Sequence, residues 1–495
     1  MTTTAVPQAF ARTGREIRVI LLGVMLAMLL AMLDNAIVGT AMPTIVRDLG
    51  GLDHMAWVVT AYTLMTAIST PVWGKLGDLF SRKTVFLTSI AVFLVGSLLS
   101  GAAWSMTALI GFRALQGLGA GGLMVGAFSI IGALVPPRER GRYQGMTAAV
   151  MAIGTIGGPL LGGMVADQLS WRWAFYLNLP LGLLAFGWSA MLLDLPATRR
   201  KVTIDYAGIG ALAMTIGALV LAATWGGVQY AWTSGPIRGL AALAITGATM
   251  FVLAERRAAD PVIPLRMFAS RNFTLASALS LVTGVVMFAG VLYLPLFQQT
   301  VQDASASSSG LLLLPMMIPI LFTTQLVGRV MSGTGRYKIF PVLGGVALTA
   351  GAVWLSAVDA GTGRLATGAA MALLGLGLGL TMQLTVTIAQ NSVDMTDIGA
   401  ASGTVTLFRT IGGSLGIAAF GAIFTRSLDG RTPAAGPAYL DAVAHGTAKI
   451  FLAVAAVSAT WLTISWLITE HPLRTAPASK PDERPAPIPM TQSAR

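Results

Sequence analysis

The stretch RVILLGVMLAMLLAMLDNAIVGT, residues 18–40, is apolar apart from its first residue, the acidic residue Asp34 and the uncharged polar residues Asn35 and Thr40. At 1.5 Å of rise per residue, a helix of this length crosses a hydrocarbon core of about 30 Å. The stretch is too long for a signal peptide, and no small-residue cleavage site precedes the next polar stretch. We therefore interpret residues 18–40 as a membrane-spanning helix that is retained in the chain.

The rest of the chain has the same character. Of its 495 residues, 55% are hydrophobic and only 11% are charged, and the mean hydropathy is +0.74. So few charges cannot cover the surface of a soluble protein of this size, which excludes an ordinary soluble enzyme. We count fourteen apolar runs, with approximate limits 18–40, 56–74, 84–104, 106–135, 145–166, 173–193, 206–225, 236–254, 274–297, 309–328, 338–357, 364–388, 400–425 and 448–469.

The basic residues predict how these runs are oriented. If the runs alternate across the membrane, 23 of the 32 Lys and Arg residues fall on the side of the two termini, seven fall on the other side, and Arg113 and Arg409 lie inside runs. Short loops rich in Lys and Arg stay in the cytoplasm. Both termini are therefore predicted to be cytoplasmic, at an inner membrane. The net charge of +12 is explained by this topology, without a nucleic-acid partner.

Several classes of chemistry are excluded by composition. The chain has no cysteine, and its three histidines, His54, His445 and His471, lie outside the long apolar runs. Thiolate or histidine metal sites and disulfides are therefore not expected. No nucleotide-binding motif or catalytic constellation is present, so we expect neither an enzyme nor a bound cofactor.

An internal sequence repeat predicts two repeated halves. Gly74 is followed eight residues later by Arg82, and Gly328 is followed eight residues later by Arg336. The sequence Ile-Gly-Gly also recurs, at residues 156–158 and 411–413. In both cases, the two copies of the motif lie eight predicted helices apart. Repeated halves are a common transporter plan. The predicted organisation is a cytoplasmic tail 1–17, a six-helix half 18–198, two inserted helices 199–260, a second six-helix half 261–470, and a proline-rich disordered tail 471–495.

Three charged residues inside the runs are the strongest functional candidates. A buried charge costs roughly 2.5–3.5 kcal/mol on insertion scales, so it needs a partner or a function. Asp34 could bind and release a proton, or it could form a structural ion pair. Arg113 could contact Asp34 in a proton-dependent way, or it could bind backbone carbonyls permanently. Arg409 could meet an anionic group of a substrate, compensate Asp34 across the bundle, or pair near a helix end.

Some polar and aromatic residues could line a substrate cavity. Aromatic residues near the ends of runs are more often interfacial anchors than ligands, and both interpretations stay open. The candidate cavity residues are Tyr62, Gln116, Tyr293, Gln298 and Arg409.

Three groups of residues form motifs in chain order: Gly74, Leu76, Asp78, Arg82 and Lys83 in the predicted loop after helix 2, Arg113, Gln116, Gly117 and Gly119 in helix 4, and Gly154, Gly158, Pro159, Gly162 and Gly163 in helix 5. Two more are Leu33, Asp34, Ala41 and Pro43 in helix 1, and the stretch 171–180 at the junction between helices 5 and 6. Together these motifs resemble those of the major facilitator superfamily, and the helix 1 motif and the junction are similar to those of its fourteen-helix drug:proton antiporter branch.

The resemblance implies a role for each motif. The residues after helix 2 would form a gating network on the cytoplasmic side, the helix 4 motif would take part in proton coupling, and the glycines and proline of helix 5 are typical of antiporters. The fold implied is an all-helical membrane bundle of two pseudo-symmetric six-helix halves and two inserted helices. The second half has no carboxylate inside a run, so a strong preference for dicationic drugs is not expected.

The function expected from these observations is proton-coupled export of small amphipathic compounds by alternating access. The proton gradient would supply the energy, and the partners would be protons, the substrate and membrane lipids, with no oligomer required. Three alternatives stay open: a dedicated exporter of one natural product, peptide or lipid, a symporter, and a membrane scaffold or receptor that transports nothing.

Overall fold

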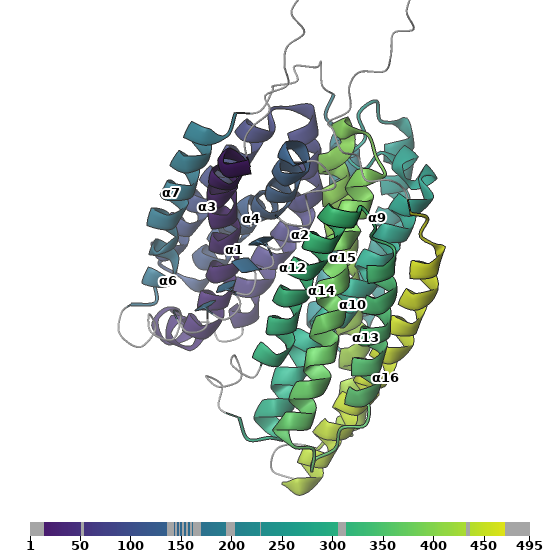
Figure 1. Cartoon of the computed structure of the whole chain (residues 1–495). Helices are drawn as coiled ribbons and strands as arrows, with labels where there is room; N and C mark the ends of the chain where they lie inside the picture. The colour runs from purple at the N-terminus through teal and green to yellow at the C-terminus, as the bar shows by residue number, and fades with distance from the viewer. Residues whose placement is uncertain are drawn as a thin grey trace, which may run out of the picture.

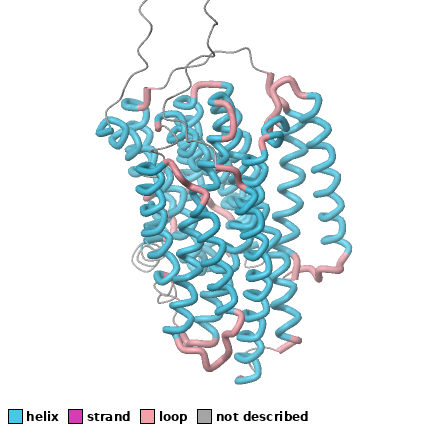
Figure 2. Tube along the Cα trace, turned by 45° about the vertical axis from the view of Figure 1, so that its right-hand side comes forward, coloured by secondary structure: helices cyan, strands magenta, loops and turns pink. Residues whose placement is uncertain are grey.

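The computed structural model describes residues 14–50, 54–135, 170–194, 203–227, 229–304, 313–431 and 436–470, with only isolated positions between 143 and 161. The described part of the chain is helical, with short connections between the helices (Figure 2). Its long helices are α1 (Gly14–Leu49), α2 (Met55–Leu79), α3 (Arg82–Gly101), α4 (Met106–Leu134), α7 (Asn178–Leu192), α8 (Tyr206–Trp225), α9 (Gly235–Arg257), α10 (Arg271–Thr300), α12 (Leu314–Thr334), α13 (Ile339–Leu355), α14 (Arg364–Asn391), α15 (Ile398–Leu428) and α16 (Pro437–Leu467).

Three shorter elements complete the described structure. A single turn, α6 (Trp173–Tyr176), precedes α7, and two 3₁₀ turns, η2 (Leu265–Ala269) and η3 (Met395–Asp397), precede α10 and α15.

Every predicted run except the fifth coincides with one of these helices, and the fifth, 145–166, lies largely outside the described residues. Among the described helices, eleven are long and apolar enough to cross a membrane. The prediction of a helical membrane protein with many spans is confirmed, while the count of fourteen stays a prediction. The tails 1–17 and 471–495 lie wholly or mainly outside the described residues.

The stretch after the second run differs from its predicted form. It was expected to be a loop from Gly74 onward, but α2 continues to Leu79 and α3 begins at Arg82. The polar residues Lys75 and Asp78 therefore occupy the last turns of a helix. Lys75 is 9% exposed, and the carboxylate of Asp78 finds hydrogen-bond donors on another helix, which allows this polar end to pack rather than unwind.

The helix contacts repeat between the two halves (Figure 1). In the N-terminal half, α4 packs against α1, α2 and α3, and α7 packs against α1 and α3. In the C-terminal half, α14 packs against α10, α12 and α13, and α16 packs against α10 and α13. The two halves thus have the same pattern of neighbouring helices in the same chain order, which agrees with the internal repeat in the sequence.

Glycines at matching positions make these contacts close. A methyl group at Gly117 of α4 would collide with the carbonyl oxygen of Tyr62 in α2, and one at Gly375 of α14 would collide with the carbonyl oxygen of Met316 in α12. Small residues allow helix backbones to approach in lipid, where apolar side chains gain little by meeting each other. Gly117 and Gly375 therefore bring together the corresponding helix pair in each half.

The halves meet on the side at which α1 begins and α16 ends, which we call the termini side. There, α15 of the second half packs against α2 and α4 of the first (Figure 1). The helices α8 and α9, which were predicted to be an inserted pair, pack on each other, and α8 also contacts both α2 and α15. This pair therefore lies beside the junction between the halves.

Candidate functional site

Asp34 lies in α1 and is completely buried. Its Oδ2 accepts a hydrogen bond from Nη1 of Arg113 at 2.6 Å, and its Oδ1 accepts from Nε2 of Gln116 and from Nδ2 of Asn178, each at 2.7 Å. Three donors from two other helices thus converge on one carboxylate. Charge-assisted bonds of this length are the strong class of hydrogen bond in proteins.

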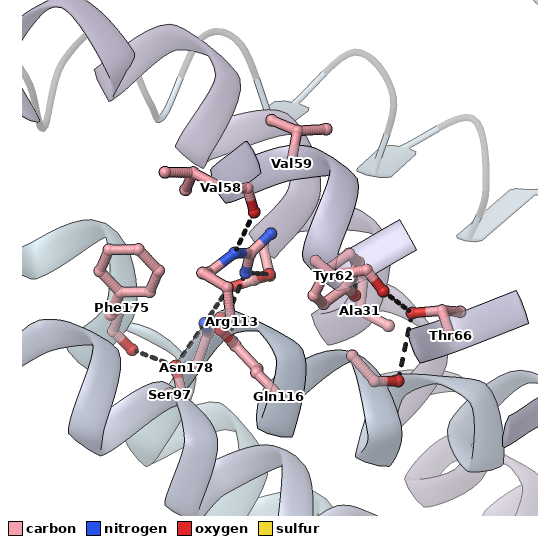
Figure 3. A network of polar contacts seen from close by, with 12 residues as sticks. Ala31, Val58, Val59, Tyr62, Thr66, Ser97, Arg113, Gln116, Phe175 and Asn178 are labelled. Atoms are coloured by element: carbon pink, nitrogen blue, oxygen red, sulfur yellow. Dashed lines mark hydrogen bonds and ion pairs between the residues drawn. The ribbon is translucent and has the colours of Figure 1, made fainter. Parts of the chain in front are cut away.

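Arg113 is held from several directions (Figure 3). Its Nη1 also donates to Oε1 of Gln116 at 2.8 Å, which is possible because residues three apart share a helix face. Its Nε donates to the carbonyl oxygen of Val58 at 3.4 Å. The ring of Tyr62 lies 4.0 Å from the guanidinium carbon, in the range of a cation–π contact. The contact expected between Asp34 and Arg113 is therefore present.

Tyr62 and Gln116 were named as cavity candidates, but here they contact Arg113 and Asp34. The Tyr62 hydroxyl donates to the carbonyl oxygen of Ala31 in α1 at 3.3 Å, so the ring is fixed against the guanidinium. Both side chains are buried, with 5% and 0% exposed. In this conformation they belong to the network around Asp34.

Asn178 belongs to the stretch 171–180 that resembles the helix 5–6 junction, but no role was predicted for it. It begins α7, and its amide donates both to Asp34 and to Oγ of Ser97 in α3 at 2.9 Å. Ser97 donates in turn to the carbonyl oxygen of Phe175 at 2.9 Å (Figure 3). A signal was available, because a polar residue two positions before Pro180 at the start of an apolar run needs a hydrogen-bond partner.

The glycines expected in helix 5 lie against α1 around Asp34. A methyl group at Gly154 would lie 2.5 Å from Cβ of Met32, and one at Gly158 would collide with Cβ of Ala36. Met32 and Ala36 flank Asp34 by two residues on each side. The other members of the motif, Pro159, Gly162 and Gly163, lie outside the described residues.

The predicted gating residues connect the two halves. Asp78, at the end of α2, accepts hydrogen bonds from the backbone N–H groups of Gly399 at 2.9 Å and Ala400 at 2.7 Å, at the start of α15. Arg82 donates to Asp78 and to the carbonyl oxygen of Met395, both at 3.0 Å. A carboxylate at a helix N-terminus is favoured by the free N–H groups and by the helix dipole.

The backbones also meet closely at this junction. A methyl group at Gly74 would lie 2.6 Å from the carbonyl oxygen of Gly399, and one at Gly399 would collide with the carbonyl oxygen of Gly74. Lys83, the remaining gating candidate, is half-buried in the first turn of α3.

Asp78 lies beyond the apolar run 56–74, and its environment changes its acidity. Burial raises the pKa of its carboxyl from 3.8 to about 6, although Arg82 and the two backbone N–H groups lower it in part. The junction between the halves therefore contains a group that titrates in mildly acidic solution.

A second ion pair joins the segment after the insert to the same junction. Arg266 in η2 donates through Nη2 to both carboxylate oxygens of Asp397, at 3.0 and 2.8 Å. Asp397 is 6% exposed and immediately precedes α15. This contact raises the pKa of Arg266 and gives Asp397, in a connection without basic residues of its own, a positive partner.

The cavity candidates of the second half are buried. Tyr293 and Gln298 of α10 are 5% and 2% exposed. Tyr293 lies among the rings of Phe420 and Phe424, and Nε2 of Gln298 is 3.4 Å from Sδ of Met371. Arg409 of α15 is 6% exposed and does not pair with Asp34 in this conformation, since Asp34 is bound to Arg113.

Two repeated helical halves, joined on one side and carrying a buried ion pair in the first, define a membrane transporter of the two-domain class. The chain belongs to the Major Facilitator Superfamily, whose family model matches residues 24–417.

Relatives and solved structures agree with this membership. The chain is 39% identical over 479 residues to an uncharacterised MFS-type transporter of Mycobacterium tuberculosis, covering 92% of this chain and 70% of that protein. It is 36% identical to the multidrug transporter protein MdtP of Bacillus subtilis, covering 81% and 74% respectively. It is 34% identical to multidrug resistance protein 3 of the same organism, covering 86% and 82%.

Among solved structures, the proton:xylose symporter XylE superposes with a TM-score of 0.62 at 12% identity, covering 91% of this chain and 97% of that one. The human organic anion transporter MFSD10 superposes with a TM-score of 0.63 at 12% identity, covering 90% and 100%. At this identity the two likenesses show the fold alone.

Proposed function

We propose that this transporter is a proton-coupled antiporter that exports amphipathic drugs or other small toxic compounds across the cytoplasmic membrane. The observation that carries the proposal is the buried carboxylate of Asp34 with three donors from α4 and α7. Relatives named as multidrug transporters in Bacillus subtilis support the substrate class.

The proposed role of Asp34 is to carry the proton. As a carboxylate it accepts only, and it is matched by donors from Arg113, Gln116 and Asn178. Protonation removes its charge and puts a hydrogen on one oxygen, so the ion pair with Arg113 is lost and at least one donor must find another partner. Binding a proton thus changes the packing of α1 against α4 and α7.

The glycine contacts transmit this change. Gly154 and Gly158 touch α1 at Met32 and Ala36, one turn or less from Asp34, without an intervening side chain. A smooth contact of this kind lets α1 shift along its neighbour when the carboxylate changes state.

The contact at the termini side supplies the gate. With both termini in the cytoplasm, as the basic residues predict, Asp78 holds the start of α15 and closes the cytoplasmic side in this conformation. Alternating access then requires that α2 and α15 separate when the cavity opens inward. Asp34 would protonate in the outward-open state, favour release of the substrate, and lose its proton to the cytoplasm after the switch.

The energy available is adequate for this cycle. One proton moving inward yields about 2.3 kcal/mol for each 100 mV of membrane potential, before any pH difference is added. The proton gradient is the only energy source that the proposal needs.

The test is transport by purified protein in acid-loaded proteoliposomes, with a fluorescent amphipathic dye added outside. We expect the wild type to accumulate dye while protons leave, and Asp34→Asn to match empty liposomes. Asp359→Asn is the matched control, because Asp359 is an exposed carboxylate in the connection between α13 and α14. Size-exclusion profiles and melting temperatures of the three proteins establish that each is folded.

Each other result points elsewhere. Full coupled transport by Asp34→Asn would overturn the role of Asp34. Wild-type dye transport that ignores the pH gradient would favour a symporter or another coupling. Transport of one compound and no chemically unrelated ones would favour a dedicated exporter, and no transport at all would favour a scaffold or receptor.

A further inference from the structure

Arg409 is a buried cation for which the described residues provide no partner. It lies in α15 with 6% of its surface exposed, and its buried Nη1 has no hydrogen-bond acceptor in that part of the chain. None of the ion pairs found in the described part of the chain includes it. Arg113 has a carboxylate, an amide oxygen and a backbone carbonyl as acceptors, although its own buried Nη2 also meets no acceptor among the described residues. An arginine without acceptors at membrane depth is unfavourable, so its retention suggests a ligand.

The backbone at Arg409 is held firmly. Gly284 of α10 meets the carbonyl oxygen of Arg409, and Gly412 meets the carbonyl oxygen of Leu281, so no side chain separates α10 and α15 here. The guanidinium is therefore presented from a fixed helix crossing rather than from a mobile loop. A fixed donor loses little freedom when a ligand binds.

Gln383 is placed at the same level on the neighbouring helix. The helices α14 and α15 are antiparallel neighbours, and Nε2 of Gln390 donates to Oγ of Ser402 at 2.8 Å. Gln383 lies seven residues before Gln390, and Arg409 lies seven residues after Ser402. Seven residues are about two helical turns, so Gln383 lies on the same face of α14 as Gln390, and Arg409 on the same face of α15 as Ser402. Because the helices are antiparallel, both steps lead in the same direction from the Gln390–Ser402 contact. Gln383 is 4% exposed, and its Oε1 meets no hydrogen-bond partner among the residues that the structure describes.

Charge counting gives the sign of the ligand. Inside the apolar runs of the described helices, the buried charges are Asp34, Arg113 and Arg409. Asp34 neutralises Arg113, which leaves one positive charge on Arg409. When Asp34 is protonated, two positive charges are left. An anionic group is therefore attracted in either state, and a dication is repelled, more strongly in the protonated state.

We propose that Arg409 binds a carboxylate of the transported compound, with the amide of Gln383 as a second polar contact. The substrates are then amphipathic zwitterions or anions rather than dications. The inference rests on the proposed function, because it takes the bound compound to be the one that is transported. The binding preference itself can be measured without any gradient.

The experiment compares two dyes that share one ring system. Rhodamine 110 carries a free carboxylate, and rhodamine 123 is its methyl ester. Equilibrium binding to the purified full-length protein in detergent is measured by fluorescence anisotropy, at neutral pH. One charge-assisted hydrogen bond corresponds to about a tenfold change in affinity or more, so we expect the wild type to bind rhodamine 110 at least about tenfold more tightly than rhodamine 123.

The variants assign this preference to Arg409. Arg409→Gln is expected to remove the preference by weakening binding of rhodamine 110 alone, and Arg409→Lys to keep part of it, because the charge stays and the planar fork is lost. Arg336→Gln is the matched control, since Arg336 is an exposed arginine between α12 and α13. It should bind both dyes as the wild type does.

Two results would overturn the inference: a wild type that binds rhodamine 110 no more tightly than rhodamine 123, or a preference that survives in Arg409→Gln. Failure of the proposed function looks different. If Asp34→Asn keeps full coupled transport while Arg409→Gln loses the carboxylate preference, the coupling mechanism is wrong and the binding role of Arg409 stands. If Asp34→Asn loses coupled transport and Arg409→Gln changes nothing, the reverse holds.

Discussion

Asp34 and Arg113 of the N-terminal half correspond to Val286 and Met371 of the C-terminal half. Arg113 lies four residues before Gly117, and Met371 lies four residues before Gly375, the glycine with the matching contact. The repeated packing therefore does not require the ion pair. One half carries a paired charge at this place, and the other fills the same place with apolar side chains.

The correspondence of Asp34 follows from the contacts on either side of it. Met32 and Ala36, which flank Asp34, face Gly154 and Gly158. In the second half, Gly284 and Phe288 flank Val286 and face Arg409 and Gly413. Arg409 therefore takes the place that a glycine has in the first half. The first half has glycines beside a paired carboxylate, and the second has a cation without a partner among the described residues. In the proposed mechanism, this difference assigns the proton to the first half and the substrate to the second.

The sharpest way to break this comparison is to remove Arg113. Arg113→Leu leaves Asp34 buried without its counter-charge, and breaking a buried pair in this way costs about 3–5 kcal/mol. We expect a large fall in the melting temperature of the purified protein. The double variant Asp34→Asn/Arg113→Leu should recover most of the loss. An Arg113→Leu protein as stable as the wild type would mean that the pair is not structurally coupled.

Asp78 tests whether a well-partnered carboxylate still carries a cost of burial. Its pKa is about 6 in this structure and 3.8 when exposed, so the folded form binds a proton more tightly. Stability from this group is greatest below pH 4 and falls as the pH rises to about 6, by up to about 3 kcal/mol, since one pKa unit corresponds to about 1.4 kcal/mol. The difference in melting temperature between wild type and Asp78→Asn, followed from pH 4 to 8, should fall over this window and stay level above it. A constant difference would contradict the shift.

Arg409→Leu should act in the opposite sense to Arg113→Leu. No described partner loses its counter-charge, and an unpaired buried cation is replaced by an apolar side chain. Without substrate present, we expect a gain of about 2 kcal/mol in stability, measured by thermal unfolding beside the Arg113→Leu protein. A loss as large as that of Arg113→Leu would show that Arg409 has a structural partner and would remove the contrast between the halves.

Asn178→Ala gives the smallest effect and refines the network of the first half. It removes a hydrogen bond to a charged acceptor, so we expect a cost of about 1.5 kcal/mol in the wild-type background. In the Asp34→Asn background the cost should be smaller, because the acceptor is no longer charged. Equal costs in both backgrounds, measured as a double-mutant cycle, would mean that Asn178 acts through Ser97 rather than through Asp34.

Much of the fold could be predicted because membrane helices are marked by length and apolarity alone. Asp34 and Arg113 could also be predicted, since a charge inside an apolar run stands out against its neighbours. The role of Asn178 was harder to predict, because its side chain is uncharged. The helical form of the stretch around Asp78 depends on contacts with α15. One of these is the hydrogen bond between Asp78 and Gly399, which are 321 residues apart in the chain, and no local sequence pattern contains that information.

The contact between Gly74 and Gly399 offers a site at which a substitution can change the balance between conformations. Since a methyl group at either residue meets a backbone carbonyl of the other, Gly74→Ala or Gly399→Ala acts as a wedge in one conformation only. A wedge that costs about 2.8 kcal/mol changes the ratio of the two conformations about a hundredfold. In the proposed alternating-access cycle, such variants would enrich a purified sample in the inward-open form, for conformation-specific antibodies and for imaging.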